Sequence, residues 1–438
     1  MGMSDSVRTS FSMKIKTRIQ NGLRSASRVV DLDLRYYLLG SFWLTFAHVI
    51  SILLSLILSV LFARLASQTF YGQYRFALSF FSLLSILTLP GLNLAMVRAI
   101  ANGRDDAFMH GTGAKFKFSC LAAIPLLGMA WYFLVFKGSS LGWAFVIAAP
   151  LFPLTYGFAN SAYFTGKKRF RHGGVLLVVQ QGIMVFLVGV TLMVTHNVVL
   201  VIFAYLLAQA IVNISVYQRI RRSLPYREPL GKAHSQGSSQ RDLIRYGQHL
   251  TAMRIISTGA EQLDKLLLAY FLGFQHVAIY AIATTIPKAV KGIFKQISSL
   301  VLPRLAVTPK NKVHFKIRMK ILHLFLLGIF PAAVLWIILP HLIPLVYTSK
   351  YAGAVLPAQI LALSLLLSPW IQTLRSGLVS HQATRQLYMF YTVVPITRIL
   401  LLISFIPLWG VTGAAFSLLL SRTFAAGYLY FAVRQMGS

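Results

Sequence analysis

A succession of long apolar segments runs along almost the whole chain and limits what it can fold into more than any other feature. A helix of about 20 apolar residues crosses the hydrocarbon core of a bilayer. Only 12% of the 438 residues are charged, whereas about a quarter is usual in a soluble domain. The segments therefore predict an all-α polytopic membrane protein with about twelve transmembrane helices. The expected spans are 39–63, 74–97, 115–136, 141–164, 173–195, 198–219, 247–272, 276–303, 319–347, 353–380, 388–408 and 410–434.

The formal net charge of +33 is extreme, and on a soluble protein it would suggest nucleic acid as the partner. In a membrane protein its meaning depends on location, because Lys and Arg concentrate in cytoplasmic loops. With the N-terminus inside, 31 of the 42 Lys and Arg residues fall in the N-terminal arm, in the cytoplasmic loops with the span ends that adjoin them, and at the C-terminus. This distribution favours twelve spans in the cytoplasmic (inner) membrane with both termini in the cytoplasm, and no nucleic acid partner. The four residues on the opposite side are Arg64, Arg75, Lys137 and Lys350.

Composition divides the chain into four parts. Residues 1–38 are basic and rich in serine, without the apolar core and cleavage site of a secretory signal. We expect a cytoplasmic arm that either lies on anionic lipid or stays disordered. Residues 220–246 are basic and rich in Ser and Gly, which predicts a cytoplasmic linker. The linker would separate an N-lobe of six helices (39–219) from a C-lobe of six helices (247–438).

A weak internal repeat supports two lobes. Tyr74 opens the second expected span and Arg98 follows it 24 residues later, while Tyr280 and Arg304 have the same spacing around the eighth span. Since both copies start on the same side of the membrane, the lobes would be parallel repeats related by an axis along the membrane normal.

Motifs of enzymes and metal sites are missing from the sequence. There is no Cys/His cluster with zinc spacing, no phosphate-binding glycine loop and no Gly-x-Ser-x-Gly elbow. The single cysteine, Cys120, cannot form an intrachain disulfide. We therefore expect no catalytic residues, no metal and no cofactor.

Seven basic residues lie more than five residues from either end of an expected span, all in the second half of the chain. Each would cost about 2.5–3.5 kcal/mol near the centre of a lipid-facing helix. We therefore expect them to face water or polar partners. The seven are Arg254, Lys265, Lys288, Lys291, Lys295, Arg398 and Arg422.

The spacing of these charges places them on helix faces. In the eighth span Lys288, Lys291 and Lys295 lie within about 80° of arc on an ideal helix. In the seventh, Arg254, Glu261 and Lys265 share a face, with Asp264 at its edge. Two neighbouring helices would thus present polar stripes rich in cations.

Two interpretations of the stripes remain open. In the structural one, Glu261 pairs with Lys265 one turn away, and Asp264 locks Lys288 or Lys291. In the functional one, the cations line a wet cavity for an anionic cargo, because two carboxylates cannot neutralise seven cations. Glu261 and Asp264, the only carboxylates in the expected spans, are candidates for binding a coupling ion or for forming an internal salt bridge.

Two stretches resemble a known family of transporters. Residues 61–101 read LFARLASQTFYGQYRFALSFFSLLSILTLPGLNLAMVRAIA, and residues 261–290 read EQLDKLLLAYFLGFQHVAIYAIATTIPKAV. The first resembles the opening signature of bacterial polysaccharide-exporter flippases, such as O-antigen transporters, of the multidrug/oligosaccharidyl-lipid/polysaccharide (MOP) superfamily. The second resembles the start of that family's second lobe, with Asp264 and Gly273 at the familiar places.

The resemblance implies a two-lobe, V-shaped MOP/MATE-like fold and a flippase rather than an enzyme. Its cargo would be a polyprenyl-diphosphate-linked oligosaccharide, moved across the bilayer by alternating access for cell-surface polysaccharide biosynthesis. The transporter would work as a monomer, alongside other polysaccharide-assembly proteins. The residues expected to bind the diphosphate are Arg254, Lys288, Lys291, Lys295, Arg398 and Arg422.

Other functions fit the sequence less well. Peptidoglycan-precursor flippases of the superfamily usually have more spans and carry cations in the first lobe. A cation-coupled multidrug exporter of the same superfamily would commonly use first-lobe carboxylates, which residues 39–219 lack inside their expected spans. A membrane-embedded polysaccharide polymerase or ligase would usually carry a sizeable extracytoplasmic loop, and every expected outer loop here is short.

Overall fold

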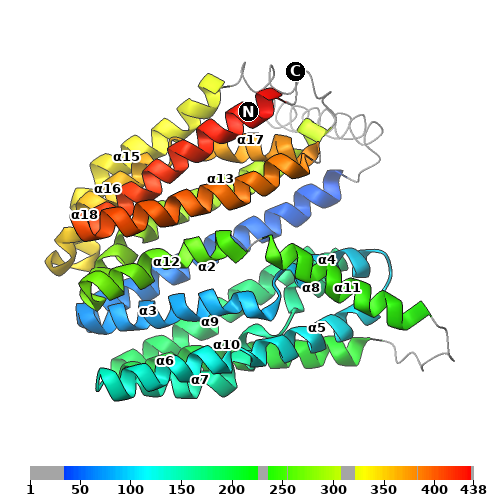
Figure 1. Ribbon diagram of the computed structural model, residues 1–438, viewed down its shortest axis with the longest axis horizontal. Coiled ribbons are helices and arrows are strands. Elements are labelled where there is room, and N and C mark those ends of the chain that lie inside the picture. The colour runs from blue at the N-terminus through cyan, green and yellow to red at the C-terminus, as the bar shows by residue number, and fades with distance from the viewer. Residues whose placement is uncertain (1–33, 225–234, 254, 307–320, 382, 436–438) are drawn as a thin grey trace, which may run out of the picture.

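The computed structural model describes residues 34–435, apart from 225–234, 254, 307–320 and 382. Every element in these ranges is a helix. The helices run side by side in two groups, with α2, α3 and α12 between them (Figure 1). The expected all-α polytopic fold is therefore confirmed, whereas the basic arm before residue 34 lies outside the described residues.

The first half of the chain supplies the helices α2 to α10. They are α2 (Leu34–Leu65), α3 (Gln68–Leu84), η1 (Ser85–Thr88), α4 (Gly91–Ala101), α5 (Asp106–Cys120), α6 (Ala123–Trp131), η2 (Tyr132–Phe136), α7 (Leu141–Tyr156), α8 (Asn160–Gly166), α9 (Phe170–Val194) and α10 (Val198–Ser223).

The second half supplies the helices α11 to α18. They are α11 (Ser235–Ala252), α12 (Ile255–Leu272), α13 (Phe274–Ala306), α15 (Ile321–Tyr347), η3 (Ser349–Ala354), α16 (Val355–Leu363), α17 (Ser368–Ser380) and α18 (Thr384–Gln435). Part of the expected linker, from Ser235 onward, is thus helical, and α11 packs against α4 and α5 of the first half.

Seven helices of the described chain are long and apolar enough to cross a membrane, or nine if each of two bent pairs is one span. Helix α18 has 52 residues, but Gly410 breaks it with a φ of 59°. This break lies where the sequence predicts a boundary between the last two spans. Helices α12 and α13 carry several of the intramembrane charges and fall outside the apolar set, so the total of twelve spans stays a prediction.

The expected span 74–97 is wrong as a single straight helix. Leu89 adopts a left-handed conformation with φ 55°, and α3 with η1 meets α4 at 51°. Pro90 explains the break, because proline disfavours helical geometry in the residue before it and cannot donate a backbone hydrogen bond. The amide of Gly91, at the start of α4, instead donates to Thr251 Oγ1 of α11 at 3.0 Å.

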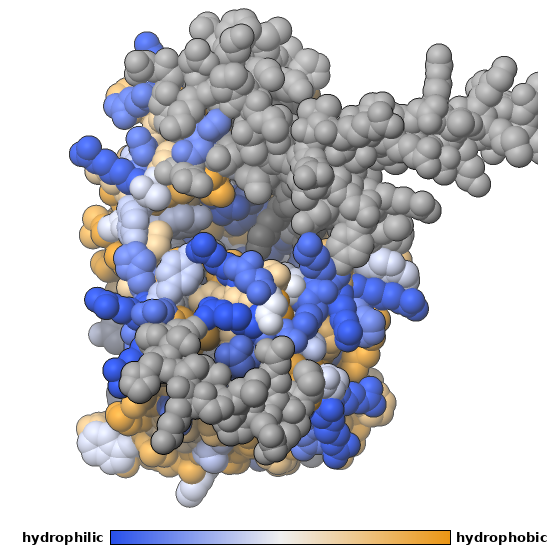
Figure 2. Space-filling model, turned by 90° about the vertical axis from the view of Figure 1, so that its right-hand side faces the viewer, coloured by the Kyte–Doolittle hydropathy of each residue, from blue (hydrophilic) through white to orange (hydrophobic). Residues whose placement is uncertain are grey.

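The two ends of the bundle differ in charge. We call the end with the α4–α5 turn (102–105) and the α8–α9 turn (167–169) the basic end, and the end where α2 turns into α3 (66–67) the α2–α3 end. Figure 2 looks onto the basic end and shows hydrophilic side chains gathered across it, with apolar residues along the sides. Of the predicted outer residues, Arg64 and Lys350 do lie at the α2–α3 end, where Arg64 donates to the carbonyl oxygen of Val346 at 3.2 Å. The positive-inside rule then predicts that the basic end is cytoplasmic.

The halves meet closely at the α2–α3 end, where α3 packs against α13. A Cβ atom added to Gly72 would overlap the carbonyl oxygen of Phe274, so the two backbones are in direct contact. Nearby, Tyr74 and Tyr280 are fully buried. These tyrosines are the matched positions of the sequence repeat: Tyr74 stacks on Phe62 of α2, with ring centres 4.4 Å apart, and Tyr280 lies on α13.

We predict that Gly72→Ala destabilises the protein, because a backbone atom must move to admit the methyl group. Overpacking of this kind typically costs about 1–3 kcal/mol. The melting temperature in detergent should therefore fall. Gly182→Ala in α9 is the matched control, because nothing lies within 4 Å of its added Cβ and alanine favours a helix over glycine. Equal melting temperatures for Gly72→Ala and Gly182→Ala would contradict the close contact.

Candidate functional site

A cavity of about 520 Å³ lies within the second half of the chain. Helices α12, α13, α16, α17 and α18 all contribute to its wall. Because α18 turns back at Gly410, both of its arms reach the cavity, with Arg398 on the first arm and Arg422 on the second. The sequence places these two arginines 24 residues apart, and the break brings them to one site.

Five cationic side chains and one carboxylate line this cavity. Lys288 and Lys291 lie one turn apart on α13, as the helical stripe predicts. Lys288 is exposed to the cavity and Lys291 is half-buried. The cationic residues of the wall are Lys288, Lys291, Arg375, Arg398 and Arg422, and the carboxylate is Glu261.

Four of the six residues predicted to bind a diphosphate therefore share one cavity. The structure does not place the other two. Arg254 lies outside the described residues, and Lys295 belongs to α13 but its side chain is not described. Lys265, on α12, is half-buried and does not line the cavity.

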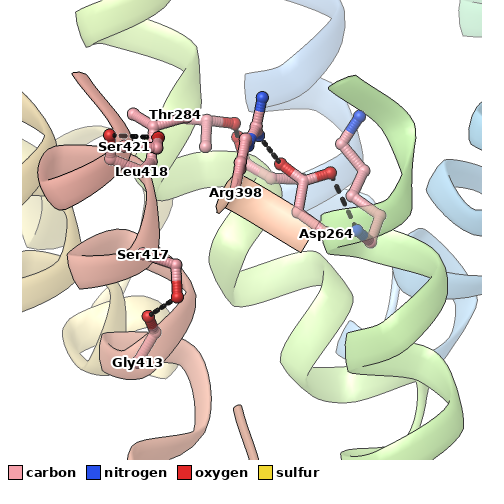
Figure 3. Close-up of polar contacts among 9 residues, drawn as sticks. Asp264, Thr284, Arg398, Gly413, Ser417, Leu418 and Ser421 are labelled. Carbon is pink, nitrogen blue, oxygen red and sulfur yellow. Dashed lines mark hydrogen bonds and ion pairs between the residues drawn. The ribbon is translucent and has the colours of Figure 1, made fainter. Parts of the chain in front are cut away.

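Asp264 forms a buried ion pair with Arg398. Its Oδ2 atom lies 3.2 Å from Arg398 Nη2, and its Oδ1 atom accepts a hydrogen bond from the backbone amide of Lys265 at 2.9 Å. Figure 3 shows the carboxylate of Asp264 directed at the guanidinium of Arg398. The Asp264 side chain is 1% exposed and that of Arg398 is 14% exposed, so both charges depend on this contact.

This pairing corrects the structural interpretation of the sequence. The partner of Asp264 is Arg398 rather than Lys288 or Lys291, and among the described residues no ion pair within 4.0 Å joins Glu261 to Lys265. The sequence could not reveal the true partner, because Arg398 is 134 residues away and reaches Asp264 only when α12 packs against α18.

Two cavity arginines have neutral partners. Arg422 Nη1 donates to Ser368 Oγ at 2.9 Å, and Arg375 Nη2 donates to Gln372 Oε1 at 2.6 Å. Neutral acceptors orient a guanidinium without cancelling its charge. Within the described part of the chain, the ammonium groups of Lys288 and Lys291 make no hydrogen bond or ion pair with protein.

The described cavity therefore carries a surplus of three positive charges, because Glu261 and Asp264 offset two of its five cations. Guanidinium groups bind planar oxyanions through paired hydrogen bonds, and ammonium groups bind them as point charges. This arrangement suits a multiply charged anion such as a diphosphate. No group of three or more metal-ligating side chains occurs among the described residues.

Arg375 is the cavity cation that the sequence analysis missed, because the charge count assigned it to a cytoplasmic loop. A signal was present in the sequence: Ser368, Gln372 and Arg375 follow one another at spacings of four and three residues, which places them on one face of a helix. The structure confirms that this polar face of α17 lines the cavity.

The first half has its own buried cation, Lys115, which is 3% exposed. Its ammonium group donates to Asn93 Oδ1 at 2.9 Å. Other amide side chains in this half join helices to one another, as where Asn213 Nδ2 donates to the carbonyl oxygen of Thr155 at 2.8 Å. These contacts are structural.

Comparisons with known proteins identify relatives of the sequence and of the fold. A family model described as "Polysaccharide biosynthesis protein" matches residues 38–308. No curated protein sequence matches the chain.

Three solved structures share the fold at low sequence identity. A lipid II flippase, MurJ, in an inward closed conformation has a TM-score of 0.70 at 15% identity, over 91% of this chain and 87% of that one. An inward-facing multidrug resistance MATE family transporter of the MOP superfamily has a TM-score of 0.67 at 12% identity, over 88% and 94%. A MOP superfamily transporter from Pyrococcus furiosus, described by the reverse polarity of its binding pocket, has a TM-score of 0.61 at 11% identity, over 90% and 95%. The expected MOP/MATE-like fold is confirmed.

We predict that Arg398→Gln lowers the amount of folded protein in the membrane, because it leaves the buried carboxylate of Asp264 without its partner. Breaking one side of a buried pair typically costs about 3–5 kcal/mol. Adding Asp264→Asn should restore the yield, since no buried charge then remains. A blot of the membrane fraction measures this.

Lys288→Gln is the control for that experiment, because Lys288 is exposed to the cavity and has no carboxylate bound to it. Its abundance should match that of the wild type. If Arg398→Gln were as abundant as Lys288→Gln, the ion pair would not be needed for stability.

Proposed function

The chain belongs to the polysaccharide biosynthesis protein family, and from this membership and the cationic cavity we propose that it is a flippase for polyprenyl-diphosphate-linked oligosaccharides. It would move the glycan across the cytoplasmic membrane for the synthesis of a cell-surface polysaccharide such as O-antigen. The protein would act as a monomer with both termini in the cytoplasm, next to other proteins of polysaccharide assembly.

The surplus of positive charge in the cavity is the observation that carries this proposal. A protein that needs cations only for stability would pair them with carboxylates, as Arg398 pairs with Asp264. Arg375 and Arg422 have neutral partners instead, and Lys288 faces the cavity. Charges left in this state in a membrane are costly unless water or an anion compensates them, and a diphosphate is an anion of suitable chemistry.

In the proposed mechanism the residues of the cavity have distinct roles. Lys288, Lys291, Arg375 and Arg422 contact the diphosphate directly. Arg398 is held by Asp264 and contributes to the cavity wall, so its effect on the cargo is weaker than its effect on stability. Arg254 and Lys295 are assigned to the same site from the helix faces on which the sequence places them.

Transport would then require the two halves to separate at the α2–α3 end, where they now touch. Ser59 Oγ and Tyr347 Oη lie 3.0 Å apart across this contact, and Arg64 donates to the carbonyl oxygens of Leu345 and Val346. Rocking of one half against the other would break these contacts and open the cargo route on that side.

Glu261 is the carboxylate that remains for other roles, because Asp264 is bound to Arg398. Its side chain is exposed to the cavity near the cations. We propose that Glu261 either takes part in ion coupling or competes with the cargo for the cations, which would help release.

Two other functions are weaker. A multidrug exporter is supported by the MATE structures of the same fold, but a cavity with surplus positive charge repels cationic drugs. A polymerase or ligase would need room for catalytic groups outside the membrane. Among the described residues, the connections at the α2–α3 end have four residues or fewer; they are 66–67, 137–140, 195–197, 273 and 348.

We predict that Lys288→Gln, Lys291→Gln and Arg422→Gln each reduce flipping by about tenfold or more, because a charged hydrogen bond to the cargo contributes roughly 1.5–3 kcal/mol. Their abundance in the membrane should stay normal, since glutamine remains polar in a wet cavity. Flipping is measured in proteoliposomes with a fluorescent polyprenyl-diphosphate-linked sugar.

Lys350→Gln is the matched control, because Lys350 is an exposed lysine at the α2–α3 end. It should flip the lipid at the wild-type rate. Normal flipping by all three cavity variants would refute the cargo site. The site would also be refuted if a cavity variant were less abundant in the membrane and adding Asp264→Asn to that variant restored its abundance.

A further inference from the structure

Two more cations, Arg75 on α3 and Lys265 on α12, lie between the halves and outside the cavity. The sequence predicts Arg75 at the outer edge of the span 74–97, but α3 begins at Gln68, so Arg75 lies two turns inside the helix and is half-buried. Helix α3 packs against both α12 and α13. Arg75 is therefore a cation of the first half that faces the charged helices of the second.

The contacts of Arg75 hold its guanidinium in place but leave its charge uncancelled. Its Nε and Nη2 atoms donate to Tyr71 Oη at 2.9 and 2.7 Å, and its Cζ atom lies 5.1 Å from the centre of the Tyr71 ring. Among the described residues, no carboxylate lies within ion-pair distance of Arg75.

Lys265 is also a cation without an ion-pair partner among the described residues. It is half-buried, and its neighbour Asp264 is bound to Arg398. Helix α12, which carries Lys265, packs against α3, which carries Arg75, and against α13, which carries Lys288. Holding like charges together inside a membrane protein is costly, so a purely structural role gives no reason for this arrangement.

These cations form a series in depth. The contact between Gly72 and Phe274 marks a common level near the α2–α3 end. With a rise of 1.5 Å per residue, Arg75 lies about 5 Å below this level, Lys265 about 14 Å, Lys288 about 21 Å and Lys291 about 26 Å. The series leads from the cavity to the end of the bundle that is closed in this structure.

An aromatic layer of the first half lies next to Arg75. Tyr71 and Tyr74 stack on Phe62, with ring centres 5.0 and 4.4 Å apart, and all three side chains are buried. A headgroup leaving the cavity toward this end would therefore meet Lys265 and Arg75 immediately before the aromatic layer.

We propose that Arg75 and Lys265 form a second anion-binding site, an exit site that receives the diphosphate from Lys288 and Lys291 before it leaves at the α2–α3 end. This inference rests on the proposed function and adds a route to it. Because Arg75 belongs to one half and Lys265 to the other, the site would change shape as the halves separate, which would favour release.

The exit site predicts that transport and binding respond differently to mutation. Arg75→Gln and Lys265→Gln should lower flipping by about tenfold, while equilibrium binding of farnesyl diphosphate to the purified protein changes by no more than about twofold. Lys288→Gln should weaken both. Inorganic diphosphate, measured in parallel, shows whether the headgroup alone binds or whether the prenyl chain is needed.

A structural role for Arg75 is tested by two further variants. Tyr71→Phe removes both hydrogen bonds of Arg75 but leaves its positive charge. Arg75→Lys keeps the positive charge but removes the guanidinium group with its several N–H donors. If the charge of Arg75 is what matters at the exit site, both variants should flip the lipid at more than about a third of the wild-type rate.

Three results would overturn the inference: unchanged flipping by Arg75→Gln, equal losses for Tyr71→Phe and Arg75→Gln, or binding weakened as much by Arg75→Gln as by Lys288→Gln. A wild-type protein that binds neither diphosphate would instead refute the proposed function, and the exit site with it.

Discussion

A charged group inside a membrane must be compensated by an opposite charge, by oriented hydrogen-bond partners or by water, and the cations in the second half of this protein differ in which of these the protein supplies. Asp264 compensates Arg398 directly. Neutral oxygens of Ser368 and Gln372 orient Arg422 and Arg375. Lys288 is exposed to the cavity and has no ion-pair partner among the described residues. The way in which these charges are compensated determines the shape of the cavity, the interface between the halves and the proposed cargo.

The ion pair between Asp264 and Arg398 has a particular place in this arrangement. It joins α12 to the first arm of α18, and Gly410 lets the second arm return with Arg422 beside it. The pair therefore fixes two walls of the cavity while removing only one cation from it. Stability and cargo binding can in this way be assigned to different side chains of one cluster.

Much of this architecture follows from local patterns in the sequence. Apolar length predicts the helices, and the stripe of Lys288 and Lys291 predicts one wall of the cavity. The partner of Asp264 could not be predicted, because Arg398 reaches it only through packing of distant helices. Arg75 was misplaced for a related reason: apolar length alone put the start of its span at Tyr74, whereas the helix begins at Gln68 and buries the arginine between the halves.

We propose above that the uncompensated lysines of the cavity bind a diphosphate. The most direct test of this proposal is the reactivity of single lysines toward an amine-specific reagent, read by mass spectrometry with and without farnesyl diphosphate. We expect farnesyl diphosphate, but not farnesol, to protect Lys288 and Lys291, while Lys350 at the α2–α3 end reacts equally in all samples. Unchanged reactivity of Lys288 and Lys291 at a saturating concentration of the diphosphate would contradict the proposal.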